Sequence, residues 1–358
     1  MRILMITYLI DEKDTIGGFV CTWIRKLAGK CEHLYVIAQE VRHEITMPNV
    51  TILSLKKEKA FSKFHQFLRF QYFVIKYVVF GRIEGVFTHL MQIYPILAGP
   101  WCKLRKTPLV MWYTHKHNDI LLKTAYLFCN KIVTATSESF PIKGRKIIPT
   151  GHGINCDKYI FRNWGNFNPQ RINIVSVGRI GLAKKYETVL QAANLLKNKY
   201  NINNFHWQIV GGESRKDESE YVRYINDLYE QLKLQDCVTF AGPVPNTEVA
   251  KCYQDADIFV NTTPKGSFDK SVLESMSSGN VAVACAQGFD KLFGKYSNLL
   301  YFKENNSEDL AYKLNKLLGM QKTEMIDIAT YLSKAIRQNH NVDILMDKLI
   351  EIFKEENR

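Results

Sequence analysis

The segment Asp257–Cys285, DIFVNTTPKGSFDKSVLESMSSGNVAVAC, constrains the fold more than any other part of the chain. Apolar residues at Ile258–Val260 predict a short buried strand, and a polar loop containing a glycine follows it. A helix carrying Glu274 comes next, and a second apolar stretch, Val281–Cys285, ends the segment. A strand, loop, helix and strand of this length are typical of a βαβ unit in a parallel sheet. Ligands of such sheets bind where the strands end, which here is the loop Asn261–Lys270.

Three strands predicted before this segment also end in residues that support a ligand site, and the first of them suits a phosphate group. The first, Arg171–Arg179, ends in Gly and Arg, and a short loop with Lys184 leads into an amphipathic helix, Tyr186–Lys199. Two cations beside a helix N-terminus, whose first N–H groups lack partners, suit a diphosphate. The next two strands end in small or turn-forming residues, namely Gly211 with Gly212, and the turn Gly242–Val244.

Six motifs of this half occur in a fixed order: VGRIGLAKK, IVGG, VTFAGPVP, ADIFV, GSFDKSVLE and MSSGNVAV. In order and spacing they resemble the retaining glycosyltransferases of family 4, which have the GT-B fold. Each motif alone is weakly specific, but six in order over residues 160–305 are strongly so. The first half of the chain resembles the family only through IGG at 16–18 and YTHKH at 113–117. The resemblance implies an α/β chain of two Rossmann-like, doubly wound domains that face each other across a cleft.

The predicted organisation is an acceptor-side domain over 1–163, a nucleotide-sugar-binding domain over 164–340, and a final helix. That helix, 341–358, is expected to cross back to the first domain, as GT-B chains do. A length of 358 residues agrees with two domains that each bury a core. In the first half, strands are predicted at 2–8, 33–38, 50–55, 84–89, 108–113 and 131–135, and helices at 18–29, 60–81, 93–105 and 119–128.

The resemblance implies transfer of a sugar from a nucleotide-diphosphate sugar to an acceptor hydroxyl, with retention at the anomeric carbon. Arg179 and Lys184 would neutralise the diphosphate leaving group, so no metal or other cofactor is expected. Glu274 would accept hydrogen bonds from the ribose hydroxyls, and Val244 would lie beside the base. The other residues expected to bind the donor are Gly17, Gly18, Gly211, Gly212, Gly266, Ser267, Phe268, Asp269 and Lys270.

The chain departs from the family at Gly266, where the family has the first Glu of its Glu-(seven residues)-Glu pair. Since that Glu lies near the donor sugar in the family, its contact has to come from elsewhere. Asp269 and Lys270 follow closely and are candidates to replace it. Asp269 is equally suited to cap the helix that follows, because short acids are favoured at that position. The two roles do not exclude each other.

Residues of the first half are expected to complete the site. His115 follows a predicted strand, where a family His reaches towards the donor sugar, and we place it with the catalytic residues; the alternative is a hydrogen-bonding loop residue. The pair Gly17-Gly18 allows close backbone approach to the donor phosphates, unless it forms an ordinary tight turn. The stretch Thr150–Asn155 resembles the family's hinge-side sequence.

A net charge of +13 predicts an acidic partner. The densest basic region, Lys56–Arg82, interleaves lysines with aromatic residues and is expected to be helical. Its opposite face is typical of a helix at a membrane interface, unless both faces are covered by the core. Nucleic acid is disfavoured, because no recognition motif accompanies the charge. The face predicted to be buried comprises Phe61, Phe64, Leu68, Tyr72, Ile75 and Val79, and the face opposite comprises Lys59, Lys63, Phe70 and Tyr77.

Other classes of protein fit the sequence less well. Eight scattered cysteines lack zinc-site spacing, and neither a signal peptide nor a run of about 18 apolar residues is visible, so we expect a cytoplasmic protein with free thiols. No G-x-G-x-x-G follows the first strand, which disfavours a dinucleotide oxidoreductase. Asp255-Ala256-Asp257 matches a metal-binding pattern, but it joins a helix to a strand and is interpreted as structural. A role in cell-envelope polysaccharide or lipid-linked glycan synthesis is expected; the alternative is a non-catalytic relative that binds sugar nucleotides or membrane lipids.

Overall fold

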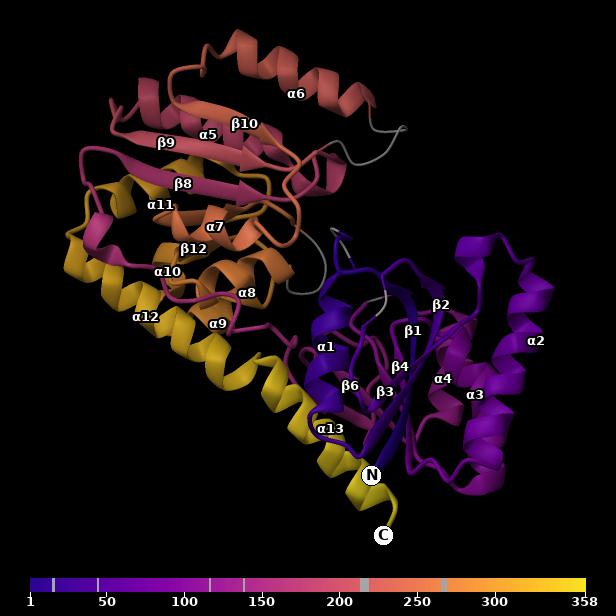
Figure 1. The fold of residues 1–358 in the computed structure, drawn as a ribbon. Helices are drawn as coiled ribbons and strands as arrows, with labels where there is room; N and C mark the ends of the chain where they lie inside the picture. Colours follow the sequence, from indigo (N-terminus) through magenta and orange to yellow (C-terminus); the bar gives the residue numbers. More distant parts are fainter. Residues whose placement is uncertain (15–16, 44, 116, 138, 213–218, 265–268) are drawn as a thin grey trace. The chain divides into compact units, whose positions relative to one another are not determined.

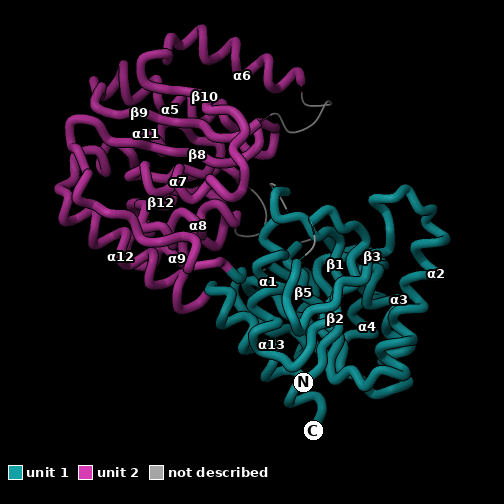
Figure 2. The backbone as a smooth tube through the Cα atoms, viewed as in Figure 1, with its two compact units in different colours: residues 1–153, 340–358 teal, residues 154–339 magenta. Residues whose placement is uncertain are grey.

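A computed structural model describes residues 1–358 except 15–16, 44, 116, 138, 213–218 and 265–268. The chain forms two compact units, one made of Met1–Gly153 with His340–Arg358 and the other of Ile154–Asn339 (Figure 2). Each unit is built on its own parallel sheet, in agreement with the predicted α/β architecture. The units divide at Gly153 and Ile154, whereas the sequence prediction placed the boundary after residue 163.

The sheet of the first unit has seven strands in the order β3-β2-β1-β4-β5-β6-β7. All its pairs are parallel, with Ile3 opposite Leu34 on one side of β1 and opposite Gly85 on the other. Helices cover both faces, so the central strands β4 and β5 are buried along their whole length. The strands are β1 (Arg2–Ile10), β2 (His33–Val41), β3 (Val50–Ser54), β4 (Gly85–His89), β5 (Leu109–Trp112), β6 (Lys131–Thr134) and β7 (Ile147–Pro149).

Two groups of helices cover the two faces of this sheet (Figure 1). On one face, Trp23 of α1 shares a core cluster with Leu345 and Phe353 of α13, and Lys26 pairs with Asp343 at 3.0 Å. The last helix therefore belongs to the first unit. The helices on this face are α1 (Phe19–Ala28) and α13 (Val342–Glu356); those on the other are α2 (Lys63–Val74), η2 (Ile75–Val79), α3 (Ile93–Arg105) and α4 (Ile120–Phe128), with the short η1 (Lys57–Lys59) before α2.

The helix predicted over 60–81 forms as α2 and η2, but the prediction of its buried face was wrong. Phe70 is 1% exposed and stacks on Tyr94 of α3 with ring centroids 5.7 Å apart. Phe64 and Tyr72, expected in the core, are 66% and 59% exposed. Aromatic residues occur all round this helix, so their spacing does not distinguish the two faces. The buried stripe is instead Gln66, Phe70, Val74 and Val78.

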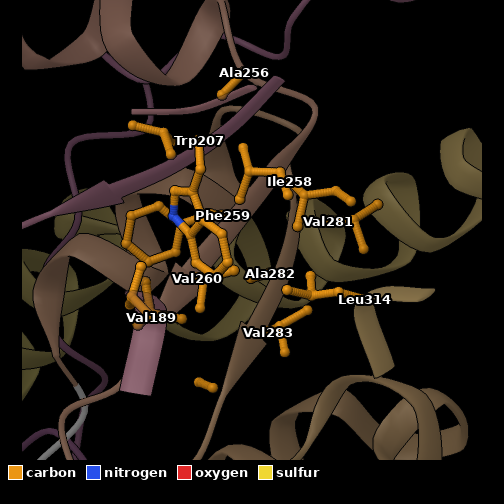
Figure 3. Packing of buried hydrophobic residues seen from close by; sticks show 14 of the residues in the cluster. Val189, Trp207, Ala256, Ile258, Phe259, Val260, Val281, Ala282, Val283 and Leu314 are labelled. Atoms are coloured by element: carbon orange, nitrogen blue, oxygen red, sulfur yellow. The ribbon is translucent and has the colours of Figure 1, made fainter. Parts of the chain in front are cut away.

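The sheet of the second unit has five parallel strands in the order β10-β9-β8-β11-β12. Helices lie on both sides of this sheet, and its central strands are accordingly apolar. Figure 3 shows Phe259 of β11 among Trp207, Val189 and Val281. The strands are β8 (Ile172–Val177), β9 (Phe205–Val210), β10 (Val238–Gly242), β11 (Ile258–Asn261) and β12 (Val281–Ala284).

Helix α5 contacts α6 and α11, whereas α8 contacts α7 and α12. None of the helices in the described part of the chain has the length and apolar character needed to cross a membrane. The helices of this unit are α5 (Tyr186–Asn198), α6 (Ser219–Gln231), α7 (Val249–Gln254), α8 (Lys270–Ser277), α9 (Phe289–Phe293), α10 (Ser297–Leu300), α11 (Ser307–Leu318) and α12 (Lys322–Asn339), with short turns of helix at η3 (Trp164–Asn166), η4 (Leu182–Lys184) and η6 (Gly294–Tyr296).

A buried ion pair joins the start of this unit to its sheet. Arg162 Nη1 lies 2.6 Å from Asp257 Oδ1, and the two side chains are 4% and 2% exposed. The other carboxylate oxygen of Asp257 accepts a hydrogen bond from the backbone N–H of Asn173 at 2.7 Å. Because both oxygens are engaged inside the fold, the geometry favours the structural interpretation of the Asp-x-Asp pattern.

Candidate functional site

The carboxyl ends of β8, β9 and β10 are held together by backbone hydrogen bonds. Gly178 donates to the carbonyl of Val210 at 2.9 Å, and Gly211 donates to that of Gly242 at 2.9 Å. One residue beyond Arg179, the N–H of Ile180 donates to Gly212 at 2.8 Å. The loops after these strands are therefore neighbours. Residues that the sequence analysis assigned separately to the diphosphate and the base lie along one edge of the sheet.

Two glycines at this edge leave room that a side chain would fill. A Cβ added to Gly211 would lie 1.9 Å from the carbonyl oxygen of Gly178. A Cβ on Gly178 would lie 2.7 Å from Cε of Lys184. The absence of both side chains lets the two strand ends approach each other, and it lets the stem of Lys184 lie across the end of β8.

Lys184 ends η4 and forms an ion pair with Asp269, which directly precedes α8. Their side chains are 21% and 18% exposed, so the pair is largely shielded from water. The hydroxyl of Thr262 donates a hydrogen bond to the backbone carbonyl of Lys184. Both the charged end and the backbone of Lys184 are thus held by the chain that follows β11.

Asp269 caps the N-terminus of α8, as one of its predicted roles required. Its Oδ1 accepts from the N–H of Ser271 at 3.2 Å and from the Ser271 hydroxyl at 3.0 Å. Its Oδ2 accepts from Asn261 at 2.9 Å and from Thr263 at 3.3 Å. Burial opposes ionisation, but the charge of Lys184 and these donors together hold the pKa of Asp269 well below its ordinary value. The carboxylate therefore stays charged at neutral pH.

Glu274 lies one turn further along α8 and accepts a hydrogen bond from the Tyr253 hydroxyl at 3.3 Å. Burial raises the pKa of Glu274, and the positive charges of Lys270 and Lys158 oppose that rise. Burial likewise lowers the pKa of Lys270 to about 7, against the attraction of Glu274. Lys158 donates to the backbone and side-chain oxygens of Asn246, both at 2.6 Å. One acid and two bases thus form a shielded polar group beside the ends of β10 and β11.

The family model for glycosyl transferases group 1 matches residues 157–338, which is the part of the chain that carries this geometry. The chain belongs to this family. A Campylobacter jejuni enzyme, N,N'-diacetylbacillosaminyl-diphospho-undecaprenol alpha-1,3-N-acetylgalactosaminyltransferase, is 21% identical over 95% of this chain and 96% of its own length. Alpha-monoglucosyldiacylglycerol synthase of Streptococcus pneumoniae is 30% identical, but the match spans 37% of this chain and only 29% of that protein.

Solved structures share the fold of this chain. HepE from Anabaena, crystallised with UDP, superposes with a TM-score of 0.75 over 99% of this chain and 100% of its own, at 14% identity. Sucrose-phosphate synthase from Thermosynechococcus elongatus gives 0.75 over 99% and 98%, at 15% identity. At such low identity the likeness concerns the fold alone, and it confirms the predicted GT-B class.

The two cations predicted to meet the diphosphate, Arg179 and Lys184, differ in their surroundings. Arg179 is exposed, and it makes no ion pair with any residue that the structure describes. Lys184, five residues on, is paired. Val244 is half-buried and packs against the core. The residues predicted at Gly266, Ser267 and Phe268 lie outside the described part of the chain.

The predicted residues of the first unit are placed as follows. Gly18 precedes α1 and donates to the carbonyl of Asp14 at 3.1 Å, where an added Cβ would lie 2.7 Å from that oxygen. Gly17 is half-buried beside it. His115 follows β5, is exposed, and meets the ring of Tyr113 edge-on at 5.5 Å. Their contact with a donor stays a prediction.

Four residues that contact Glu274 or its neighbour Lys158, or are Lys158 itself, were not found from the sequence: Lys158, Tyr159, Tyr253 and Asn246. Lys158 and Tyr159 are more than 100 positions from Glu274, in a segment to which the sequence analysis assigned no functional residue. Tyr253 lies on α7, where a tyrosine carries no signal of its own. The one signal in the sequence was Asn246 in the turn GPVPN, because an Asn side chain can accept a hydrogen bond from a neighbouring cation.

The glycine contact predicts a specific ranking of stability. Gly211 and Gly242 both have positive φ, but a Cβ on Gly242 would meet nothing within 4 Å. Gly242→Ala should therefore cost only the backbone strain, about 1–2 kcal/mol. Gly211→Ala should cost roughly 1–3 kcal/mol more, because its Cβ collides with a backbone oxygen. Urea unfolding of the two variants checks this, and equal losses would contradict the close approach of β8 and β9.

Proposed function

We propose that this chain transfers a sugar from a nucleotide-diphosphate sugar to an acceptor hydroxyl, with retention at the anomeric carbon. The observation that carries the proposal is the placement of Lys184 after β8 and of Glu274 on α8, the helix that follows the neighbouring strand β11. The chain after β11 is joined to Lys184 by the hydrogen bond from Thr262 and by the ion pair with Asp269. Membership of the glycosyl transferases group 1 supports the reaction class. The retaining outcome rests on the motif resemblance.

Lys184 and Arg179 would act on the leaving group. As the bond between the sugar and the diphosphate breaks, negative charge develops on the diphosphate oxygens, and fixed cations stabilise that charge. Both side chains lie in one loop after β8, and Lys184 is already ordered over Gly178. An ordered cation needs little rearrangement as negative charge develops on the leaving group. This favours a role in stabilising the leaving group over one in binding the donor alone.

Glu274 would bind the ribose. A carboxylate can accept hydrogen bonds from two neighbouring hydroxyls, and the ammonium groups of Lys270 and Lys158 favour its ionised form. The base and the sugar of the donor are open. UDP is the first nucleotide to test, because HepE, which shares the fold, was crystallised with UDP.

The acceptor is proposed to be a lipid-linked glycan or another glycan of the cell envelope. The Campylobacter relative carries diphospho-undecaprenol in its name, and the Streptococcus relative is named for a glucosyldiacylglycerol. Both names indicate acceptors anchored in a membrane. Such an acceptor would require the enzyme to work at the surface of the membrane.

The first unit has a surface that fits this location, on the inner face of the membrane. Residues 55–150 contain sixteen Lys or Arg and four Asp or Glu, so nearly all of the net charge of +13 lies there. On α2, Phe64, Leu68 and Tyr72 are 66%, 48% and 59% exposed, and Lys63 is exposed on the same helix. Aromatic and basic side chains together favour reversible binding to an anionic bilayer. We therefore propose a peripheral membrane enzyme.

The leaving-group role predicts a large loss for Lys184→Ala. Turnover should fall by about 10²–10³, the usual loss when one electrostatic donor is removed. Lys185→Ala is the matched control, because Lys185 is adjacent and pairs with Glu187 at 3.7 Å instead. Release of nucleoside diphosphate from a panel of sugar nucleotides measures both. Full turnover in a folded Lys184→Ala protein would remove the mechanism, and nucleotide binding by the wild type without any release would indicate a non-catalytic relative.

Metal independence is the second expectation for the reaction. Cationic side chains are expected to supply the charge that a metal would otherwise provide, and the carboxylate of Asp257 is occupied by Arg162 and Asn173. Sugar transfer should therefore persist in EDTA. A complete loss that manganese or magnesium restores would show that the leaving group needs a metal.

Membrane binding is predicted to depend on α2. Wild-type protein should sediment with anionic vesicles, less so as salt rises, and weakly with neutral vesicles. Lys59→Glu/Lys63→Glu and Phe64→Ser/Tyr72→Ser should both reduce binding. The control Lys251→Glu/Lys316→Glu makes the same charge change on exposed residues of the second unit. Equal binding by all these variants would assign the attachment to another surface.

A further inference from the structure

We propose that Asp269 is a positioning residue that acts through Lys184: it holds the lysine ammonium at the end of β8 and offsets its charge, and so limits how tightly the nucleoside diphosphate product is retained. The inference rests on the proposed function, since it concerns the diphosphate that Lys184 would meet. It starts from the contrast between two cations of one loop. Lys184 carries a counter-charge, and Arg179 has none among the described residues.

The position of Lys184 is determined at three points. Its Nζ pairs with Asp269, its stem lies where Gly178 has no Cβ, and its carbonyl accepts from the Thr262 hydroxyl. A free lysine side chain has many rotamers, and ordering it costs conformational entropy. The ion pair makes this ordering part of the fold, so a ligand does not have to supply it.

The charge of Asp269 exceeds what its capping role needs. A helix N-cap requires one oxygen acceptor, and Asn serves as well as Asp. A shielded carboxylate costs desolvation free energy, which its donors must offset. In this site the oxygens of Asp269 are engaged by Lys184, Asn261, Thr263 and Ser271, so the carboxylate is committed to the fold. Its remaining influence on a ligand is electrostatic and passes through Lys184.

That influence has a definite sign. A diphosphate that approaches Lys184 meets an ammonium already engaged by the carboxylate of Asp269, so it is attracted less strongly than by an unpaired ammonium. Since the pair is largely shielded, salt screens the attraction between these two charges only weakly. Removing the negative charge while keeping one oxygen for the helix cap should therefore free the ammonium, tighten diphosphate binding and slow product release.

Asp269→Asn is the decisive variant, because its single amide oxygen can keep the cap of α8 while the negative charge that faces Lys184 is removed. The probe is whichever of UDP, GDP and ADP stabilises the wild type most in a thermal-shift assay, followed by calorimetric titration. We expect the variant to bind this diphosphate about tenfold more tightly and to bind the matching nucleoside unchanged. Turnover should fall, and the inhibition constant of the diphosphate should fall with its dissociation constant.

Two matched controls separate this effect from a general change in charge or capping. Asp236→Asn makes the same substitution in another ion pair, in which Asp236 Oδ2 lies 2.6 Å from Lys197 Nζ. This pair lies just before β10 begins, at the opposite end of the strands from Asp269. Asn306→Ala removes the cap of α11, whose side chain accepts from Asp309 at 2.8 Å. Neither should alter diphosphate affinity. Tightening in either control equal to that of Asp269→Asn would overturn the proposal.

A cycle with Lys184→Met tests that Asp269 acts through the lysine. In that background Asp269→Asn should give no further change; an equal tightening there would mean that the carboxylate repels the ligand directly. Unchanged or weaker diphosphate binding by Asp269→Asn, in a wild type that binds and transfers, overturns this inference alone. A wild type that binds none of the three diphosphates overturns the proposed function and this inference with it.

Discussion

The approach of β8 to β9 at Gly178 and Gly211 determines what can be built at the edge of the second sheet. The 1.9 Å between a hypothetical Cβ of Gly211 and the Gly178 oxygen means that any other residue there would push the two strand ends apart. Because the strand ends meet, the loop after β8 turns back at once, and Lys184 reaches the start of α8. The ion pair between Lys184 and Asp269, which caps α8, forms at that point.

Charge compensation is the second theme of this edge. Lys184 is balanced by Asp269, and Glu274 by Lys270 and Lys158. Uncompensated charges would be costly at this degree of burial, so each group constrains its neighbour. Arg179 is different because it is exposed, and solvent already stabilises its charge. A polyanionic ligand would therefore meet two different cations. Arg179 is solvated, whereas Lys184 is already ordered and its charge is offset by Asp269.

The sequence predicted the fold and the strand-end residues because both depend on local pattern. Apolar runs of strand length, glycines after strands and six motifs in order are all readable without contacts. The buried face of α2 was not readable, because aromatic residues surround the helix and only packing against Tyr94 selects Phe70. Lys158 was missed for a related reason: its partner Asn246 lies far along the chain, and no local pattern announces a long-range pair.

The place of α13 has a consequence for biosynthesis. One face of the first sheet, with Trp23 and Val110, is covered in part by Leu345 and Phe353, which follow the entire second unit in the chain. A ribosome adds about 5–20 residues per second, so residues 154–339 take roughly 10–40 s to make. Throughout that interval the first unit has emerged with part of its apolar face uncovered. The second unit can finish folding first, and the nascent chain is the state in which chaperones would matter most.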